Sequence, residues 1–331
     1  MKKLFTCKSY FHQPAVMAVL MVLTLLLSAC QQVSPLEATA SKAAALNASA
    51  TPTIPAAAEP TAAELTLVTP IETPTPSTYD PASPDSWQNL PVIPENVSQR
   101  VRDLYKKGKS SGLNQTAFSK VGDCETFSPY FLAPFDMSGK GYRLGNYESL
   151  APIISTYQGS FERVSMAAKS GFSVASVLSP LWADTTLCKV DETPLVCEIR
   201  IHKPAVMLVM FGTNDVKTSS PAGFETNLKR LLDIALLNNV VPVLVTKADN
   251  IEGDHSMNAI IARVAYEYDL PLFNLWRAMQ DLPNAGMQPD GIHLTYAQPY
   301  LDLPENMLMG WPVRNLATLQ MLDFLHSQLE P

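Results

Sequence analysis

Residues 205–215 read Ala-Val-Met-Leu-Val-Met-Phe-Gly-Thr-Asn-Asp, seven apolar residues followed at once by a polar turn. A continuous apolar run of this length is typical of a strand that is covered on both faces, as in a parallel sheet. Open parallel sheets bind their ligands beyond the carboxyl ends of the strands. Asn214 and Asp215, which follow this strand, are therefore candidates for a functional site.

The rest of the folded part alternates between strand and helix patterns. Such alternation predicts an α/β fold, a three-layer α/β/α sandwich with a mainly parallel, flavodoxin-like sheet of five strands and right-handed crossovers. The expected strands other than 205–211 are residues 117–121, 161–168, 240–245 and 271–276. The expected helices are residues 147–157, 221–238, 255–268 and 315–329, the last with Asn315 as its N-cap.

Polar blocks follow the predicted strands in a fixed order. They are Gly-Asp-Cys-Glu at 122–125, Gly171, Gly-Thr-Asn-Asp at 212–215, and Asp-Gly-Ile-His at 290–293. Each block alone has a simpler interpretation: Asn-Asp after a strand is commonly a turn, and Asp-x-x-His occurs often by chance. Their occurrence after successive strands favours a shared site.

In order and spacing these blocks resemble the SGNH/GDSL hydrolases, whose pattern is Gly-Asp-Ser, an isolated Gly, Gly-x-Asn-Asp and Asp-x-x-His. The resemblance covers roughly residues 115–328. It implies hydrolysis of esters, with His293 as the base and Asp290 as the residue that orients it. It also implies an oxyanion hole made by the backbone N–H groups of Cys124 and Gly171 and the side-chain amide of Asn214.

Cys124 stands where the family has its nucleophilic serine. A Cys–His–Asp triad is chemically sound, and a position at the start of a helix favours thiolate. Against this, Asp123 and Glu125 raise the pKa of the thiol. Two functions stay open: an ester hydrolase with a cysteine nucleophile, and a catalytically impaired relative that binds a glycan or an envelope partner. A buried, inert cysteine is the structural alternative.

Several other chemistries have no support in the sequence. There is no Gly-x-Ser-x-Gly elbow, no Cys-x-x-Cys pair, no zinc spacing and no Gly-rich phosphate loop, so neither a cofactor nor a metal is expected. The net charge of −7 disfavours nucleic acid as a partner. Lys247 and Asp249, after the fourth strand, could line the substrate cleft, but a solvated loop is favoured.

The N-terminus has the layout of a signal peptide. Three lysines lie in the first eight residues, an apolar run covers residues 15–27, and residues 27–30 read Leu-Ser-Ala-Cys. This ending resembles a bacterial lipobox, after which Cys30 would carry lipid. We expect residues 1–29 to be a lipoprotein signal peptide; an ordinary signal peptide or an uncleaved anchor is the alternative. Cleavage would remove three lysines and no acid, which changes the net charge from −7 to −10.

Residues 30–85 are rich in Ala, Thr and Pro and have few large apolar side chains. Such a composition predicts a disordered linker between the lipid anchor and a folded domain at residues 86–331. The expected location is extracytoplasmic, on the cell envelope. The expected partners are the membrane, through the anchor, and a small-molecule or carbohydrate ester. The sequence does not indicate an oligomeric state.

Three cysteines remain after the predicted cleavage and lipidation, an odd number for an oxidising compartment. Cys188 and Cys197 flank a short polar segment that suits a local disulfide. Closing such a loop would contribute roughly 2–3 kcal/mol. Cys124 would then be the free thiol, although the sequence alone does not prove the pairing.

Overall fold

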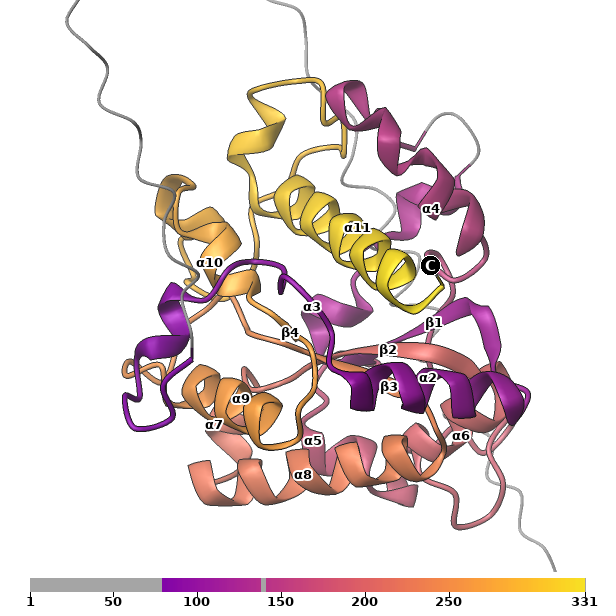
Figure 1. The fold of residues 1–331 in the computed structure, drawn as a ribbon. Helices are drawn as coiled ribbons and strands as arrows, with labels where there is room; N and C mark the ends of the chain where they lie inside the picture. Colours follow the sequence, from indigo (N-terminus) through magenta and orange to yellow (C-terminus); the bar gives the residue numbers. More distant parts are fainter. Residues whose placement is uncertain (1–78, 138–140, 331) are drawn as a thin grey trace, which may run out of the picture. The chain divides into compact units, whose positions relative to one another are not determined.

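The computed structural model describes residues 79–137 and 141–330 (Figure 1). The predicted signal peptide, Cys30 and most of the predicted linker lie outside these residues, so they stay predictions, as do the domain boundaries. Within the described ranges, no helix is both long and apolar enough to cross a membrane.

The core of the fold is a parallel sheet of four strands in the order β1-β2-β3-β4. Strands β2 and β3 are buried along their whole length, as the apolar run at 205–211 predicts. The α/β fold with a parallel sheet is therefore confirmed. The strands are β1 (Asn114–Gly122), β2 (Pro204–Met210), β3 (Val241–Val245) and β4 (Leu272–Phe273).

The prediction of a fifth strand at residues 161–168 is wrong. This segment meets the sheet at one parallel bridge, between Gly122 and Ala168. The bridge lies on the side of β1 that faces away from β2. The arrangement is that of a flavodoxin-like sheet whose outer strand is reduced to one residue pair. The chain thus changes direction between β1 and β2, where such sheets bind their ligands.

Side chains occupy the place of the missing strand along the rest of β1. The backbone N–H of Phe118 donates to Ser160 Oγ (3.4 Å), and Arg163 Nη2 donates to the Phe118 carbonyl (3.2 Å). Buried backbone groups need hydrogen-bond partners, and here side chains supply them. The segment after Ser160 is therefore free to leave the edge of β1.

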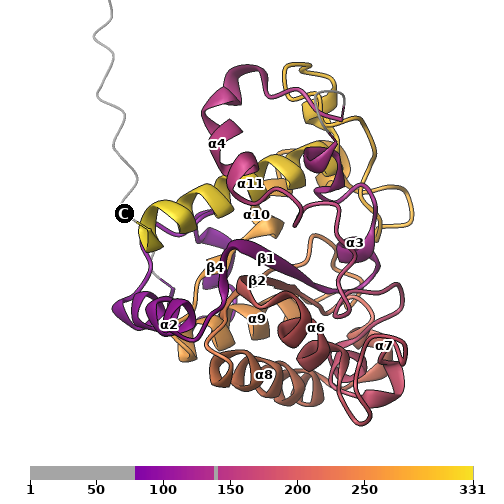
Figure 2. The same ribbon diagram turned by 90° about the vertical axis from the view of Figure 1, so that its right-hand side faces the viewer.

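Helices cover both faces of the sheet. Helices α6, α8 and α9 lie on one face and α11 on the other, with α2 packed against α11, β2 and β3 (Figures 1 and 2). The helices are α2 (Gln99–Ser110), α3 (Cys124–Phe127), α4 (Ala151–Thr156), α5 (Val174–Val177), α6 (Pro194–His202), α7 (Asp215–Thr218), α8 (Pro221–Leu237), α9 (Ser256–Glu267), α10 (Leu275–Met279) and α11 (Gly310–Leu329).

The long helices α8 and α9 match the predicted ranges, but two other predictions need correction. The predicted helix at 147–157 is a 3₁₀ helix, Gly145–Leu150, followed by the short α4, which has a proline in its first turn. Helix α11 begins at Gly310, so Asn315 is not its N-cap. The Asn315 amide instead donates to the Tyr130 carbonyl (2.9 Å) and accepts from the Leu132 N–H (3.0 Å).

A disulfide joins Cys188 and Cys197, and Cys124 is free. Cys197 belongs to α6 and is fully buried, so the bridge fastens the preceding loop to a core helix.

We expect the double variant Cys188→Ser/Cys197→Ser to lower the free energy of unfolding by about 2–3 kcal/mol, because the unfolded chain regains the entropy of the open loop. Urea denaturation of the purified protein, with and without the bridge, measures this difference. A change below about 0.5 kcal/mol would contradict the entropic estimate.

Candidate active site

Cys124 is the first residue of α3, directly beyond the carboxyl end of β1. Asp123 begins this helix, since its carboxylate accepts the backbone N–H of Glu125 (3.2 Å). Cys124 is partly exposed. Because β1 and β2 are parallel neighbours, the polar residues that follow β1 and those that follow β2 lie at the same end of the sheet.

The environment of Cys124 disfavours thiolate. Burial raises the pKa of the thiol to about 11, and the negative charges of Asp123 and Glu125 act in the same direction. The backbone N–H groups at the start of α3 do lower the pKa of the thiol, as expected for the start of a helix, but burial and the two carboxylates outweigh them. At neutral pH Cys124 is a thiol.

His293 and Asp290 form the expected pair. Asp290 Oδ2 lies 2.7 Å from His293 Nδ1, while its Oδ1 accepts the backbone N–H groups of Ile292 and His293 (3.0 Å each). These hydrogen bonds lower the pKa of Asp290 to about 2, and the same contact raises the pKa of His293. With Nδ1 directed at the carboxylate, Nε2 is the nitrogen left to act as a base.

Glu125 brings the cysteine and histidine segments together. Burial raises the pKa of the Glu125 carboxyl, and the charges of Arg314 and His293 and the backbone N–H of Leu294, the residue after His293, oppose that rise. The charges of Glu125 and Asp123 in turn raise the pKa of His293. Cys124 and His293 therefore lie on the same rim of the sheet. Among the described residues, however, no hydrogen bond joins the Cys124 thiol to His293.

The turn after β2 is tied to the loop that carries Gly171. Asn214 Nδ2 donates to the Phe172 carbonyl (2.9 Å). Asp215, buried beside it, accepts the backbone N–H groups of Val174 (3.0 Å) and Gly212 (3.2 Å). These bonds place the Asn214 amide at Phe172, the residue after Gly171, and leave one of its two N–H groups for an oxyanion.

Gly171 itself has a backbone conformation that suits the predicted role. Its φ is +83°, which other residues rarely adopt, and nothing lies within 4 Å of where a Cβ would be. The surface of the loop is therefore open at this point, and a substrate can approach the backbone closely.

Arg314 is a buried residue of the site region that the sequence reasoning missed. Its Nη1 donates to the Glu125 carbonyl (2.8 Å) and lies 3.5 Å from the Glu125 carboxylate. Its guanidinium also stacks on the Phe131 ring at 4.0 Å, and burial lowers its pKa to about 10. The available signal was one arginine within an otherwise apolar or small-residue stretch at the start of α11.

The first two turns of α11 also hold the histidine segment. The backbone N–H of Gly310 donates to Thr295 Oγ1 (2.8 Å), and that of Trp311 donates to the Thr295 carbonyl (3.0 Å). One helix end therefore contacts the segments that carry Cys124 and His293.

Lys247 and Asp249 belong to a buried hydrogen-bond network next to the turn that follows β2. The prediction that they lie in a solvated loop is therefore wrong. Lys247 Nζ donates to Asp249 (2.6 Å) and to Glu252 (2.5 Å), and Thr213 Oγ1 donates to the other Asp249 oxygen (2.6 Å). The network supports the residue next to Asn214. It does not line a cleft, because both Lys247 and Asp249 are buried.

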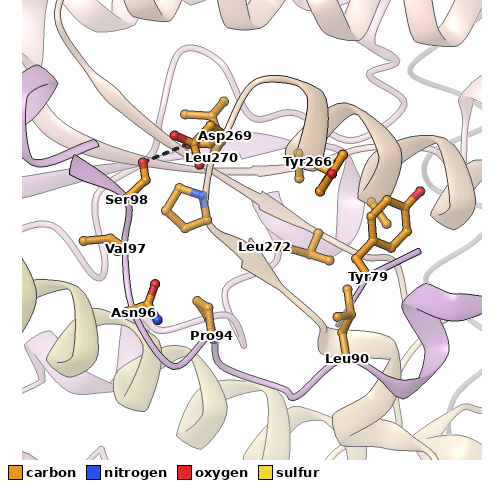
Figure 3. A pocket seen from close by; sticks show the side chains of 13 residues that line it. Tyr79, Leu90, Pro94, Asn96, Val97, Ser98, Tyr266, Asp269, Leu270 and Leu272 are labelled. Atoms are coloured by element: carbon orange, nitrogen blue, oxygen red, sulfur yellow. Dashed lines mark hydrogen bonds between the residues drawn. The ribbon is translucent and has the colours of Figure 1, made fainter. Parts of the chain in front are cut away.

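The pocket of about 220 Å³ in Figure 3 is not part of this site. Leu270 and Leu272, which line it, lie where the chain enters β4. The pocket therefore lies at the amino-terminal ends of the strands, whereas Cys124 lies beyond their carboxyl ends. We assign no chemistry to it.

We expect Cys124 to react slowly with iodoacetamide at pH 7, because a thiol pKa of about 11 in place of 9 leaves about 100-fold less thiolate. The rate should rise about tenfold per pH unit up to about pH 11, as long as the fold persists. Peptide mass spectrometry reads the modification of Cys124 separately from other cysteines. Labelling at pH 7 as fast as that of a free thiol would show that the site stabilises thiolate.

Replacement of Arg314 by methionine should destabilise the protein by about 3–5 kcal/mol, since it leaves the Glu125 carboxylate buried without its cation. Urea unfolding measures the loss. Arg143→Met is the matched control: Arg143 is 47% exposed and paired with Asp302, so the cost should stay below about 1 kcal/mol. Equal costs for the two variants would show that the Arg314–Glu125 contact contributes little.

Part of this chain is similar to a known protein family. Residues 164–297 match the model of the GDSL-like lipase/acylhydrolase family. The predicted resemblance is thereby confirmed over a stretch that contains Gly171, Asn214, Asp290 and His293, but not Cys124. A search of curated proteins gives no match.

Among solved structures, a catalytic mutant of Axe2, an acetylxylan esterase from Geobacillus stearothermophilus, is 16% identical with a TM-score of 0.41; the match covers 64% of this chain and 96% of that one. A family 3 carbohydrate esterase from Clostridium thermocellum is 16% identical with a TM-score of 0.40, covering 64% and 99%. The esterase EstA from Pseudoalteromonas is 14% identical with a TM-score of 0.39, covering 64% and 100%. Similarities this weak carry no functional argument.

Proposed function

We propose that this chain is an ester hydrolase of the SGNH/GDSL type in which Cys124 is the nucleophile, His293 the general base and Asp290 its orienting partner. The observation that carries the proposal is the Asp290–His293 pair, at 2.7 Å, on the rim that also holds Cys124. The match of residues 164–297 to GDSL-like lipases and acylhydrolases supports the same reaction class.

The raised pKa of Cys124 shapes the mechanism. Since the resting residue is a thiol, His293 Nε2 takes the proton as sulfur attacks the ester carbonyl carbon. The carbonyl oxygen becomes an oxyanion, which the N–H groups of Cys124 and Gly171 and the Asn214 amide stabilise. The tetrahedral adduct then expels the alcohol, which receives the proton from His293, and leaves a thioester.

Water completes the cycle. His293, which is neutral again, takes a proton from a water molecule while the water oxygen attacks the thioester carbonyl carbon. Collapse of the second tetrahedral adduct breaks the carbon–sulfur bond, and the sulfur recovers the proton from His293. The products are the alcohol and the carboxylic acid. No oxidant, reductant or cofactor takes part in either half.

The proposed substrates are acyl or acetyl esters of small molecules or carbohydrates, cleaved outside the cytoplasm. The supporting observation for this location is the lipobox-like sequence that ends at Cys30. A lipid at Cys30 and the Pro-rich linker after it would hold the enzyme at the cell envelope.

A second candidate function is a binding protein that has lost catalysis and holds a glycan or an envelope partner. Two observations favour it: the pKa of about 11 for the Cys124 thiol, and a thiol that makes no hydrogen bond to His293 within the described residues. This function does not require either residue to react.

Turnover of p-nitrophenyl acetate and acetylated sugars separates the two functions. For a cysteine hydrolase, Cys124→Ala and His293→Ala should each lower kcat by at least about 10³-fold. Cys124→Ser keeps a nucleophile of the same shape and tests whether sulfur matters. An inert wild type whose serine variant gains turnover would show that the natural protein is not a competent hydrolase.

The pH profile tests the role of His293. Because only neutral His293 can act as a base, kcat/KM should rise with pH through a pKa above the ordinary 6.5. Asp290→Asn should lower this pKa, since it removes the carboxylate that holds it up, and reduce kcat by at least about 10²-fold. A profile unchanged by Asp290→Asn would contradict the assigned pair.

A further inference from the structure

The loop that precedes α6, residues 179–193, presents large apolar side chains to solvent. Leu181 is 93% exposed and Val190 92%, the two highest values among the large apolar side chains that the structure describes. Trp182 and Leu187, in the same loop, are each 52% exposed. Single apolar residues are normal on a protein surface, but four within ten residues form a patch of the kind that marks an interaction site. We call this segment the apolar loop.

The apolar loop is braced against the domain. The Cys188–Cys197 disulfide fastens it to α6. The Arg200 guanidinium, also on α6, donates to the Leu187 carbonyl (3.0 Å) and to the Glu192 carboxylate (2.7 Å). A loop that is fixed before it binds loses little conformational entropy on binding, which favours association.

The apolar loop lies on the side of the domain that carries the candidate active site. The Trp182 ring lies 6.0 Å, centre to centre, from the ring of Phe172, the residue after Gly171. The Phe172 carbonyl accepts the side-chain amide of Asn214 (2.9 Å), with which α7 begins. In Figure 2, α7 lies on the same side as α3, the helix of Cys124. A surface that the apolar loop touches would therefore face this side of the domain.

The charges of the apolar loop do not favour an anionic partner. Its one exposed cation, Lys189, is outnumbered by the exposed Asp184 and Asp191. Glu192 is buried and paired with Arg200 (2.7 Å), so this pair adds no free charge. The whole chain also has a net charge of −7. Anionic lipids attract clusters of Lys and Arg, which the loop lacks, so an apolar surface without net charge is the better match.

The N-terminal part of the chain indicates which apolar surface is within reach. Residues 31–78, 48 in all, separate the predicted lipid at Cys30 from the first described residue, Tyr79. An extended chain spans at most about 3.3–3.6 Å per residue, so roughly 160 Å of chain lets any face of the domain touch the membrane. Tethering raises the effective concentration of the loop at the bilayer, so a weak contact suffices for docking.

We propose that the apolar loop docks on a zwitterionic lipid bilayer, with Leu181, Trp182 and Val190 inserted among the lipid headgroups. Tryptophan suits this position, because its ring is apolar and its N–H can remain hydrogen-bonded at the membrane–water interface. Apolar area removed from water supplies the affinity. The proposal does not depend on the hydrolase function, since docking requires no reaction at Cys124.

Tryptophan fluorescence of the full chain tests the contact. Bromine on a lipid chain quenches an indole at short range, and of the four tryptophans Trp87 and Trp311 are buried. Vesicles of brominated phosphatidylcholine should therefore lower the emission by up to about a quarter, because one tryptophan of four touches lipid. Trp182→Phe should remove this change, since it removes the indole from the loop.

A pair of matched variants tests the apolar side chains. Leu181→Asp/Val190→Asp should reduce the quenching at least about fivefold, because two apolar contacts are lost and two charges face the lipid. Both positions are more than 90% exposed, so the urea midpoint should not change. Leu237→Asp, at an 82% exposed leucine that ends α8, is the control and should keep the quenching. All variants have the same N-terminus, so an anchor there acts on them equally.

Three results would overturn the proposal. The first is a wild type that brominated lipid does not quench, or quenches no more than Leu181→Asp/Val190→Asp. The second is quenching that requires phosphatidylglycerol and disappears at high salt, which would identify an electrostatic surface. The third is a dimer in sedimentation that Leu181→Asp/Val190→Asp abolishes, without any quenching, which would assign the loop to a second copy of this chain. None of these readouts uses ester cleavage, so a failure of the hydrolase proposal leaves this one untouched.

Discussion

The candidate site depends on one buried charge, the guanidinium of Arg314. It contacts both the carbonyl and the carboxylate of Glu125, and Glu125 in turn reaches the backbone next to His293. A buried cation and a buried carboxylate are costly apart and tolerable together, so each holds the other in place. Because Glu125 is the neighbour of Cys124, this pair fixes where the cysteine segment meets the histidine segment.

The same contact limits the chemistry of the thiol. Burial raises the pKa of the Cys124 thiol, and the two flanking carboxylates, Asp123 and Glu125, raise it further. The site is therefore unlike that of an enzyme with a preformed thiolate. Any attack on an ester has to be coupled to proton transfer to His293, and the distance between the two groups in the substrate complex decides the rate.

The sequence predicted the layers of the fold, because a continuous apolar run such as 205–211 indicates a strand covered on both faces. It also predicted which strand ends carry polar residues, because those residues follow the apolar runs directly. It did not predict that residues 161–168 would leave the sheet, since Ser160 and Arg163 replace ladder bonds by contacts far apart in the chain. Nor did it predict Arg314 or the role of Asn315. Arg314 acts through tertiary contacts with α3 and Asn315 through contacts with the loop after it, and no local pattern reports such contacts.

The reduced outer strand has a consequence for association between molecules. A free strand edge exposes unpaired N–H and C=O groups and can recruit a strand from another chain, which leads to aggregation. Here the edge of β1 is blunted, because Ser160 and Arg163 occupy the hydrogen-bonding groups of Phe118 and the Arg163 charge lies along the edge. The backbone groups of Phe118 are thus unavailable to a strand from another molecule.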